Sequence, residues 1–259
     1  MTSLHGLVVI VLSCSMLAAC STSHPPARPP ESTASIHADQ NPSESVIAET
    51  DPPSAVSHPP GEPESVDDYQ MLVKRLQSGD LTVDFRKLRE SFTQTKLFNP
   101  YDDDLGDTST DMLKALDEKR FEDAISAADR LLDLNYTAIL PHIISAICWN
   151  ELGNSEKERF HGEIVKGLVR SITDSGDGSE ARPYRIIRIQ EEYDLLNVMG
   201  LELESQALIT SGSSMLDQMT VIDSTTKDKK QIYFNVDICF AFWEKQLPVE
   251  SGDPGNARN

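Results

Sequence analysis

The sequence predicts an α+β fold in which helical hairpins are followed by a small antiparallel sheet. From residue 66 to residue 172, apolar side chains recur every three or four positions, which is typical of amphipathic helices. After the polar run at 174–179, apolar and polar residues alternate, as they do in half-buried strands. Residues 105–172 also repeat with a period of 34. These three observations predict helices first and strands second.

The repeat is visible in the apolar positions of its two units. A shift of 34 residues places Met112 on Ala146 and Leu131 on Val165. A period of 34 with two helices per unit is typical of tetratricopeptide repeats. The stretch therefore resembles that superfamily, in a degenerate form. The resemblance implies helical hairpins packed side by side and a protein-binding groove, but no chemistry.

Capping patterns and apolar stripes set the limits of the expected helices. Thr108 is the expected cap of the third helix and Ser155, with Glu158, that of the sixth. Gly79 is expected to end the first helix. The six helices are expected at about 66–78, 85–92, 108–118, 121–134, 141–152 and 156–172.

The part after residue 180 is expected to contain a meander and two helices. Strands are expected at 184–189, 205–210, 215–223 and 231–238. The expected helices cover 191–199, ended by Gly200, and a short segment around 240–247.

Charge and motif content exclude several classes of function. The formal net charge is −19, from 42 acidic and 23 basic residues. Nucleic acids and anionic lipid surfaces attract basic proteins, so neither is expected as the main partner. The chain has no metal-binding cysteine spacing, phosphate loop or catalytic serine motif. We therefore expect no cofactor and no metal.

The beginning of the chain has the pattern of an export signal. Residues 7–17 form an apolar run that is too short to span a bilayer stably. The run ends in Leu17-Ala18-Ala19-Cys20, which resembles the cleavage site of a bacterial lipoprotein signal. The resemblance implies lipidation of Cys20 with acyl chains such as palmitate, a membrane anchor, and outer-membrane sorting because Ser21 follows. An ordinary signal peptide or a membrane anchor is the alternative, since residues 1–6 contain no Lys or Arg.

Composition divides the rest of the chain into a tether, a folded domain and a tail. The tether is rich in Pro and Ser and has no aromatic residue, so it cannot bury enough apolar area to fold. The expected organisation is a signal peptide at 1–19, the lipidated cysteine and tether at 20–65, one folded domain at 66–247 (helical at 66–172, mixed at 180–247) and a disordered tail at 248–259.

Six short segments of the folded part resemble a family of bacterial exported domains of unknown function. The matching segments are 83–89, 93–95, 99–101, 191–193, Gln206 and 233–237. The resemblance implies one domain over about residues 66–247. It brings no activity, cofactor or catalytic residue.

Several acidic residues are candidates for chemistry. Glu191, Glu192, Asp217 and Asp237 have the residue types of paired glycosidase carboxylates, although solvated charges at strand ends and helix starts explain them as well. The aspartates at 102–104 offer hard oxygens for calcium, but the glutamate that completes an EF-hand is absent. We therefore expect these carboxylates to be solvated.

Cysteines and histidines are also candidates for a site. Cys148 and Cys239 are 91 residues apart, and we expect buried free thiols, with a disulfide as the alternative. His142 and His161 are expected on helix faces and not as ligands.

The function expected from these features is non-enzymatic binding of a protein or peptide by an envelope lipoprotein. The groove implied by the helical resemblance is lined by Leu113, Asp117, Ile143, Ile147, Asn150 and Glu151. The alternatives are a hydrolase that acts on envelope glycans and a purely structural lipoprotein.

Overall fold

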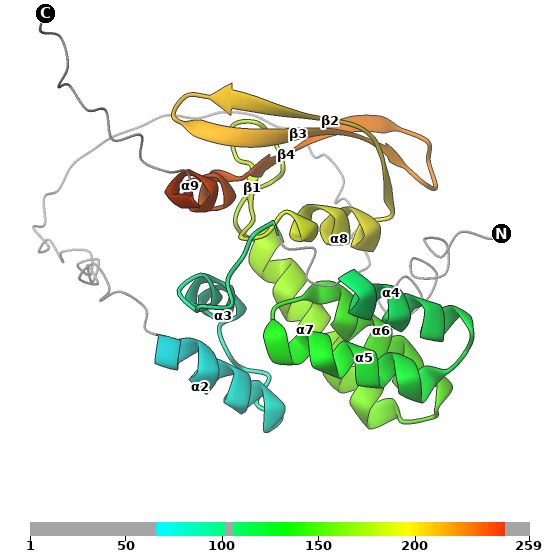
Figure 1. Ribbon diagram of the computed structural model, residues 1–259. Coiled ribbons are helices and arrows are strands. Elements are labelled where there is room, and N and C mark those ends of the chain that lie inside the picture. The colour runs from blue at the N-terminus through cyan, green and yellow to red at the C-terminus, as the bar shows by residue number, and fades with distance from the viewer. Residues whose placement is uncertain (1–65, 102–105, 247–259) are drawn as a thin grey trace, which may run out of the picture.

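A computed structural model describes residues 66–101 and 106–246 of the chain. These residues form eight helices and one four-stranded sheet. The α+β class is therefore confirmed. The helices fill the lower part of the molecule and the sheet lies above them, with α8 (Gln190–Val198) between the two layers (Figure 1).

The chain first forms a pair of short helices, α2 (Val66–Gln77) and α3 (Phe85–Phe92). Gly79, with a φ of 90°, follows α2, which is the backbone conformation that glycine adopts most readily beyond a helix end. The Asp84 side chain caps α3 by accepting a hydrogen bond from the Lys87 backbone N–H at 3.0 Å. The Tyr69 hydroxyl accepts a hydrogen bond from the Tyr136 backbone N–H at 2.9 Å, which joins α2 to the central helices.

Four helices then pack in succession, each against the next. They are α4 (Gly106–Asp117), α5 (Phe121–Leu134), α6 (Ile139–Glu151) and α7 (Ser155–Thr173). Ala124 and Ala128 of α5 are fully buried, and such small side chains let helix axes approach closely.

Two expected caps of these helices are wrong. Helix α4 begins at Gly106, so Thr108 lies inside its first turn. The cap of α7 is Asn154, whose side chain accepts from the Lys157 backbone N–H at 3.1 Å. Asn154 precedes Ser155 by one residue and also carries a side-chain oxygen, so the two caps are hard to distinguish by pattern.

The sheet has the strand order β1-β4-β3-β2. Its strands are β1 (Tyr184–Arg185), β2 (Leu201–Ser211), β3 (Ser214–Asp223) and β4 (Lys229–Asn235). The expected sheet was antiparallel, whereas β1 pairs parallel to β4. The expected strand at 184–189 is also wrong beyond its first two residues, and the strand at 231–238 ends earlier, because α9 (Asp237–Gln246) begins there.

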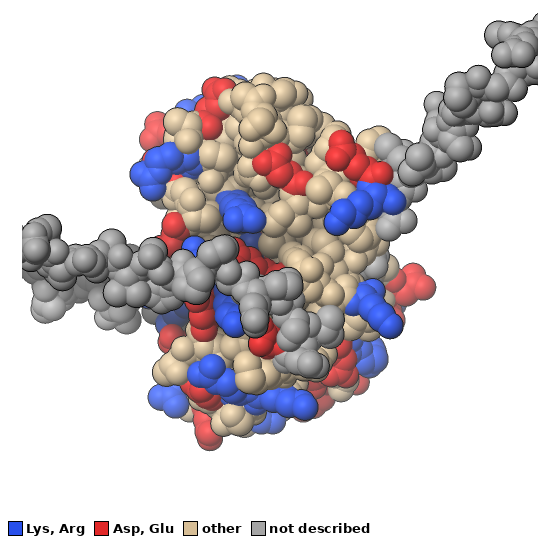
Figure 2. Space-filling model, turned by 90° about the vertical axis from the view of Figure 1, so that its left-hand side faces the viewer, with Lys and Arg blue, Asp and Glu red and all other residues tan. Residues whose placement is uncertain are grey.

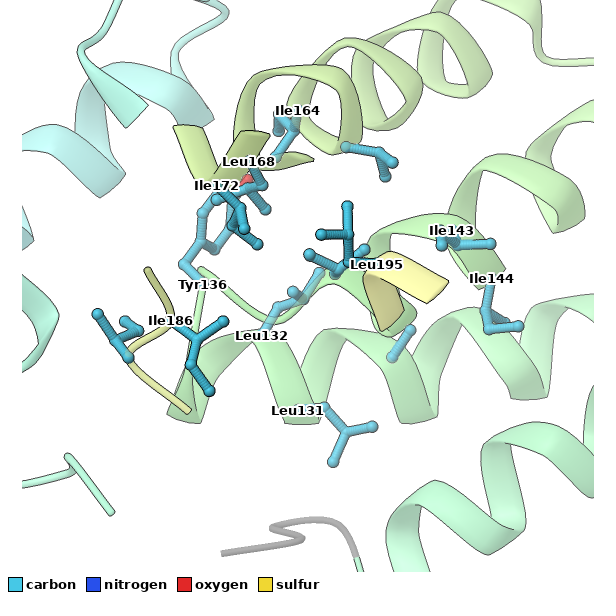
Figure 3. Close-up of a cluster of buried hydrophobic side chains, with 14 of the residues drawn as sticks. Leu131, Leu132, Tyr136, Ile143, Ile144, Ile164, Leu168, Ile172, Ile186 and Leu195 are labelled. Atoms are coloured by element: carbon cyan, nitrogen blue, oxygen red, sulfur yellow. The ribbon is translucent and has the colours of Figure 1, made fainter. Parts of the chain in front are cut away.

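Helices α8 and α9 cover one face of the sheet, and no described helix covers the other (Figure 1). Alternate residues of β3 point toward this covered face: Asp217, Met219 and Val221 are all buried. On its other side α8 contacts the helical layer. Leu195 of α8 lies among core side chains of α5, α6 and α7 (Figure 3). The helices and the sheet therefore share one core.

Candidate functional site

The edge strand β2 is an open hydrogen-bonding surface. It is the last strand in the sheet order, and no other described strand pairs with its outer side. Residues 202–208 are all exposed, and Leu208 is 52% exposed. A free strand edge presents unpaired N–H and C=O groups that can pair with another extended chain.

The turn after β2 determines which backbone groups face outward. Ser211 pairs with Ser214 across a two-residue turn, and the φ of Gly212 is 61°, as in a type II′ hairpin. The closing pair of such a hairpin exchanges both backbone hydrogen bonds, and hydrogen-bonded pairs alternate with non-bonded ones along the strands. The residues whose N–H and C=O groups consequently point away from β3 are Gln206, Leu208 and Thr210.

Only the first part of this edge carries features that discourage pairing with another strand. The register shifts between Leu203 and Ser205, which places a bulge at Glu204. Glu202 is a second acidic residue there, and Lys229 of β4 forms an ion pair with Glu204. Charges and bulges discourage edge pairing.

Residues 205–211 have no charge, no proline and no bulge, and we call them the open segment. In Figure 2 Lys and Arg are interspersed with Asp and Glu, and the upper part of the view, where the hairpin end of the sheet lies, has a broad uncharged area. The open segment therefore lacks the features that normally prevent a strand edge from pairing.

A polar cluster with two buried carboxyl groups holds the open segment in place. The Gln206 amide Nε2 donates a hydrogen bond to Asp217 Oδ2 at 2.8 Å and also lies 3.4 Å from Glu192 Oε2. The Tyr193 hydroxyl donates to Gln206 Oε1 at 2.8 Å. We call Glu192, Tyr193, Gln206 and Asp217 the carboxyl cluster. It ties the edge strand to both β3 and α8, so the edge is preorganised for pairing.

One carboxyl group of the cluster, that of Glu192, has a raised pKa. Glu192 is fully buried, and this burial, reinforced by the adjacent Asp217 carboxylate, raises the pKa of Glu192 to about 9. At neutral pH Glu192 is therefore protonated and donates a hydrogen bond to Asp217. Glu192 Oε1 is buried and accepts no hydrogen bond.

The other two candidate carboxylates have structural partners. Glu191 Oε2 lies 2.6 Å from Arg89 Nη2 in a buried ion pair and also accepts the Ile187 backbone N–H at 2.9 Å. Asp237 Oδ1 accepts the Met215 backbone N–H at 2.8 Å.

The structure thus brings together only Glu192 and Asp217 of the four candidates. Glycosidase carboxyl groups lie about 5–9.5 Å apart with sugar or water between them. Here Glu192 is fully buried and donates a hydrogen bond to Asp217, so its carboxyl group is not accessible to a sugar.

The six residues of the predicted helical groove differ in accessibility. Asp117, Asn150 and Glu151 are exposed and Leu113 is half-buried. Ile143 and Ile147 belong to the core, and Ile143 lies near Leu195 of α8 (Figure 3). A ligand on this surface would therefore meet the four accessible residues.

The histidines and cysteines are buried between packed elements. His142 of α6 and His161 of α7 lie on helix faces, as expected, and their Nδ1 atoms are 3.0 Å apart in the core. Burial lowers the pKa of His142 to about 3 and that of His161 to about 4, so both are neutral. Cys148 and Cys239 are buried free thiols, as expected. Burial raises the pKa of Cys148 to about 11, so this thiol is unreactive.

Some expectations lie outside the described residues. These are the lipidation site Cys20, the tether and the aspartates at 102–104. Within the part of the chain that the structure describes, no group of three or more His, Cys, Asp or Glu side chains is arranged to hold a metal ion. Among the helices at 66–101 and 106–246, none is long and apolar enough to cross a membrane.

The fold and the edge strand define an α+β domain with an open sheet edge. The chain belongs to the family described as "Domain of unknown function (DUF4919)", whose model matches residues 62–242. The resemblance to a family of domains of unknown function is therefore confirmed. Comparison with curated proteins and with solved structures gives no match.

Proposed function

We propose that the folded domain is a non-enzymatic protein-binding module that accepts an extended strand of its partner along the open segment of β2. The free edge at residues 205–211 is the observation that carries this proposal. In strand addition, main-chain hydrogen bonds provide affinity and alternate side chains provide specificity. Leu208 lies on the face of the sheet that α8 and α9 cover, but its own side chain is exposed. It can therefore supply an apolar contact to the added strand.

We further propose that the domain acts at the cell envelope as an outer-membrane lipoprotein facing the periplasm. The support is the Leu17-Ala18-Ala19-Cys20 pattern and the Pro-rich residues that follow it. A lipid at Cys20 would anchor the chain, and a tether at 21–65 would let the domain reach a partner about 40 Å away.

Two competing proposals rest on other features. A groove on the helical stack would use Asn150 and Glu151, which are exposed. A hydrolase acting on envelope glycans would use Glu192, which has a raised pKa, but its carboxyl group is hydrogen-bonded to Asp217 and fully buried. The open edge is preferred because its donors and acceptors are exposed and uncharged.

The test compares crosslinking in intact cells for the wild-type chain and for Leu208→Pro. The Leu208 N–H points away from β3, so proline removes one outward donor and leaves the intramolecular ladder intact. We expect Leu208→Pro to keep the wild-type melting temperature within a few degrees and to lose the crosslinked partner.

Asn150→Ala/Glu151→Ala is the matched control for the helical groove, and it should retain the partner. If Leu208→Pro retains the partner and the groove variant loses it, the binding surface lies on the helical stack and strand addition is wrong.

A further inference from the structure

The open segment is close to a palindrome in polarity. Its sequence, Ser-Gln-Ala-Leu-Ile-Thr-Ser at 205–211, reads polar, polar, apolar, apolar, apolar, polar, polar in both directions around Leu208. Such symmetry suits a strand that pairs with an antiparallel copy of itself, because a two-fold axis brings each residue opposite its mirror position.

A two-fold axis at Leu208 matches both faces of the strand. Gln206 would lie opposite Thr210 of the second copy, and Leu208 opposite its own counterpart. These residues lie on the face that α8 and α9 cover, since Gln206 contacts Asp217 and Leu208 pairs with Asp217 across the strands. On the other face, Ala207 would meet Ile209. Polar residues therefore meet polar ones, and apolar residues meet apolar ones.

The backbone pattern agrees with the same axis. The outward N–H and C=O groups belong to Gln206, Leu208 and Thr210, and an axis at Leu208 maps this set onto itself. Three hydrogen-bonded pairs would form, with about six hydrogen bonds in total.

An axis moved by two residues along β2 would lose pairing. At Gln206 it would run the pairing into the bulge at Glu204, and at Thr210 it would extend past the turn at Gly212.

The charges of the edge favour this register as well. With the axis at Leu208, Glu204 would face position 212 of the second copy, and the two Glu204 side chains would be about 27 Å apart at 3.4 Å per residue. This distance exceeds the screening length of about 8 Å at physiological salt. The two Glu204 carboxylates therefore repel each other little in this register.

We infer that the strand accepted by β2 is β2 of a second copy of this chain, so that two four-stranded sheets join into one eight-stranded sheet. The inference rests on the proposed use of β2 and adds the identity of the partner. The assembly is a closed dimer, because the two-fold pairing uses the open segment of both copies and leaves neither free.

The experiment is disulfide crosslinking of the full-length chain carrying Leu208→Cys. Facing residues of a hydrogen-bonded antiparallel pair have Cα atoms about 5.5 Å apart, within the range of about 4.4–6.8 Å that a disulfide bridges. Under a mild oxidant we expect a band at twice the chain mass on a non-reducing gel, and its loss on reduction.

The matched control is Leu203→Cys, on the same strand and also exposed, at 39%. With the axis at Leu208, the two copies of residue 203 would lie more than about 30 Å apart, so this variant should remain a monomer band, as should the wild type with its native cysteines. Light scattering should also be measured on the chain that carries Leu208→Arg as its only substitution. Its dimer dissociation constant should be at least tenfold higher than that of the wild type.

Each other outcome overturns the inference. Equal crosslinking by both cysteine variants would indicate random collision. An adduct of Leu208→Cys only with proteins of another mass would exclude the second copy and leave strand addition standing. If Leu208→Cys gives no adduct and Leu208→Pro also keeps its cellular partner, the dimer and the proposed function both fail.

Discussion

Gln206 on the edge strand donates a hydrogen bond from Nε2 to Asp217 Oδ2 on the neighbouring strand, at 2.8 Å. The two residues are diagonal neighbours, because Asp217 pairs directly with Leu208. Asp217 also accepts a hydrogen bond from the protonated Glu192 of α8. One carboxylate thus fixes the edge strand to the sheet and to the helix below it, and the protonation of Glu192 becomes part of the edge's stability.

Replacing Glu192 by glutamine should stabilise the protein at neutral and alkaline pH. The pKa of Glu192 is raised from 4.5 in the unfolded chain to about 9 in the fold, so its stabilising contribution is complete below 4.5 and is lost as the pH rises toward 9. A glutamine amide stays neutral and still donates to Asp217. At pH 8 Glu192→Gln should exceed the wild type by up to about 5 kcal/mol in urea unfolding, at about 1.4 kcal/mol per pH unit above 4.5, and at pH 4.5 the two should agree. A variant that is less stable at both pH values would contradict the raised pKa of Glu192.

The histidine pair should make the protein sensitive to acid. Their pKa values fall from 6.5 to about 3 for His142 and about 4 for His161. Because the unfolded chain takes up protons first, stability is highest above pH 6.5 and is lost as the pH falls below it, by at most about 1.4 kcal/mol per pH unit for each histidine.

The corresponding variant is His161→Gln, which should show a shallower loss than the wild type between pH 6.5 and pH 4. Thermal melting at several pH values measures this difference directly. Identical pH slopes for the two proteins would show that the pair does not titrate as described.

Removing one partner of the buried ion pair between Arg89 and Glu191 should reduce the stability of the protein more than replacing both partners by apolar residues. Both side chains are nearly inaccessible, and Arg89 also donates to the Arg185 carbonyl at 3.2 Å. Arg89→Ala leaves a buried carboxylate unpaired, so we expect a loss of roughly 3–5 kcal/mol. Arg89→Met/Glu191→Leu should recover part of this loss, because it removes both charges. Chemical denaturation of the three proteins provides the comparison, and a double variant less stable than the single one would refute it.

Replacing either of two glycines of α7 by alanine should change the stability of the protein, in opposite directions for the two positions. A Cβ at Gly167 would lie 2.3 Å from Phe85 Cε2 of α3, whereas a Cβ at Gly162 meets nothing within 4 Å. Gly167→Ala should therefore destabilise the protein by roughly 1–3 kcal/mol. Gly162→Ala should stabilise it by about 0.5–1 kcal/mol, because alanine favours the helix. Equal melting temperatures for the two variants would mean that α3 does not pack on α7 as described.

Sequence periodicity predicted the helical half of the fold well. The bounds of α5, Phe121–Leu134, agree with the expected 121–134, because a clear apolar stripe lies between two polar breaks. The start of β2 was missed: it begins at Leu201 and not at 205, although Leu201 and Leu203 alternate with glutamates. Gly200 marks the end of the preceding helix, and the alternation of leucine and glutamate directly after it is the signal for the start of β2.

The candidate site could not be predicted in the same way, because it depends on strand order. Glu192, Gln206 and Asp217 were each visible as polar residues, but their meeting requires α8 to pack under β2 and β3. The outer edge of β2 is free because β1 joins the sheet next to β4, at the opposite end from β2. Such pairings between distant segments leave no local periodic signal. The pairing of His142 with His161 was missed for the same reason.

The most direct test of the binding edge is the hydrogen-exchange rate of single backbone amides along β2, measured by NMR at low and high protein concentration. In the isolated chain, the amides of Ala207 and Ile209 should be protected by β3, and those of Gln206, Leu208 and Thr210 should exchange freely. At high concentration these three amides should become protected and the other two should not change. If Gln206, Leu208 and Thr210 exchange freely at every concentration and with envelope extract added, the open segment binds no strand and the account is wrong.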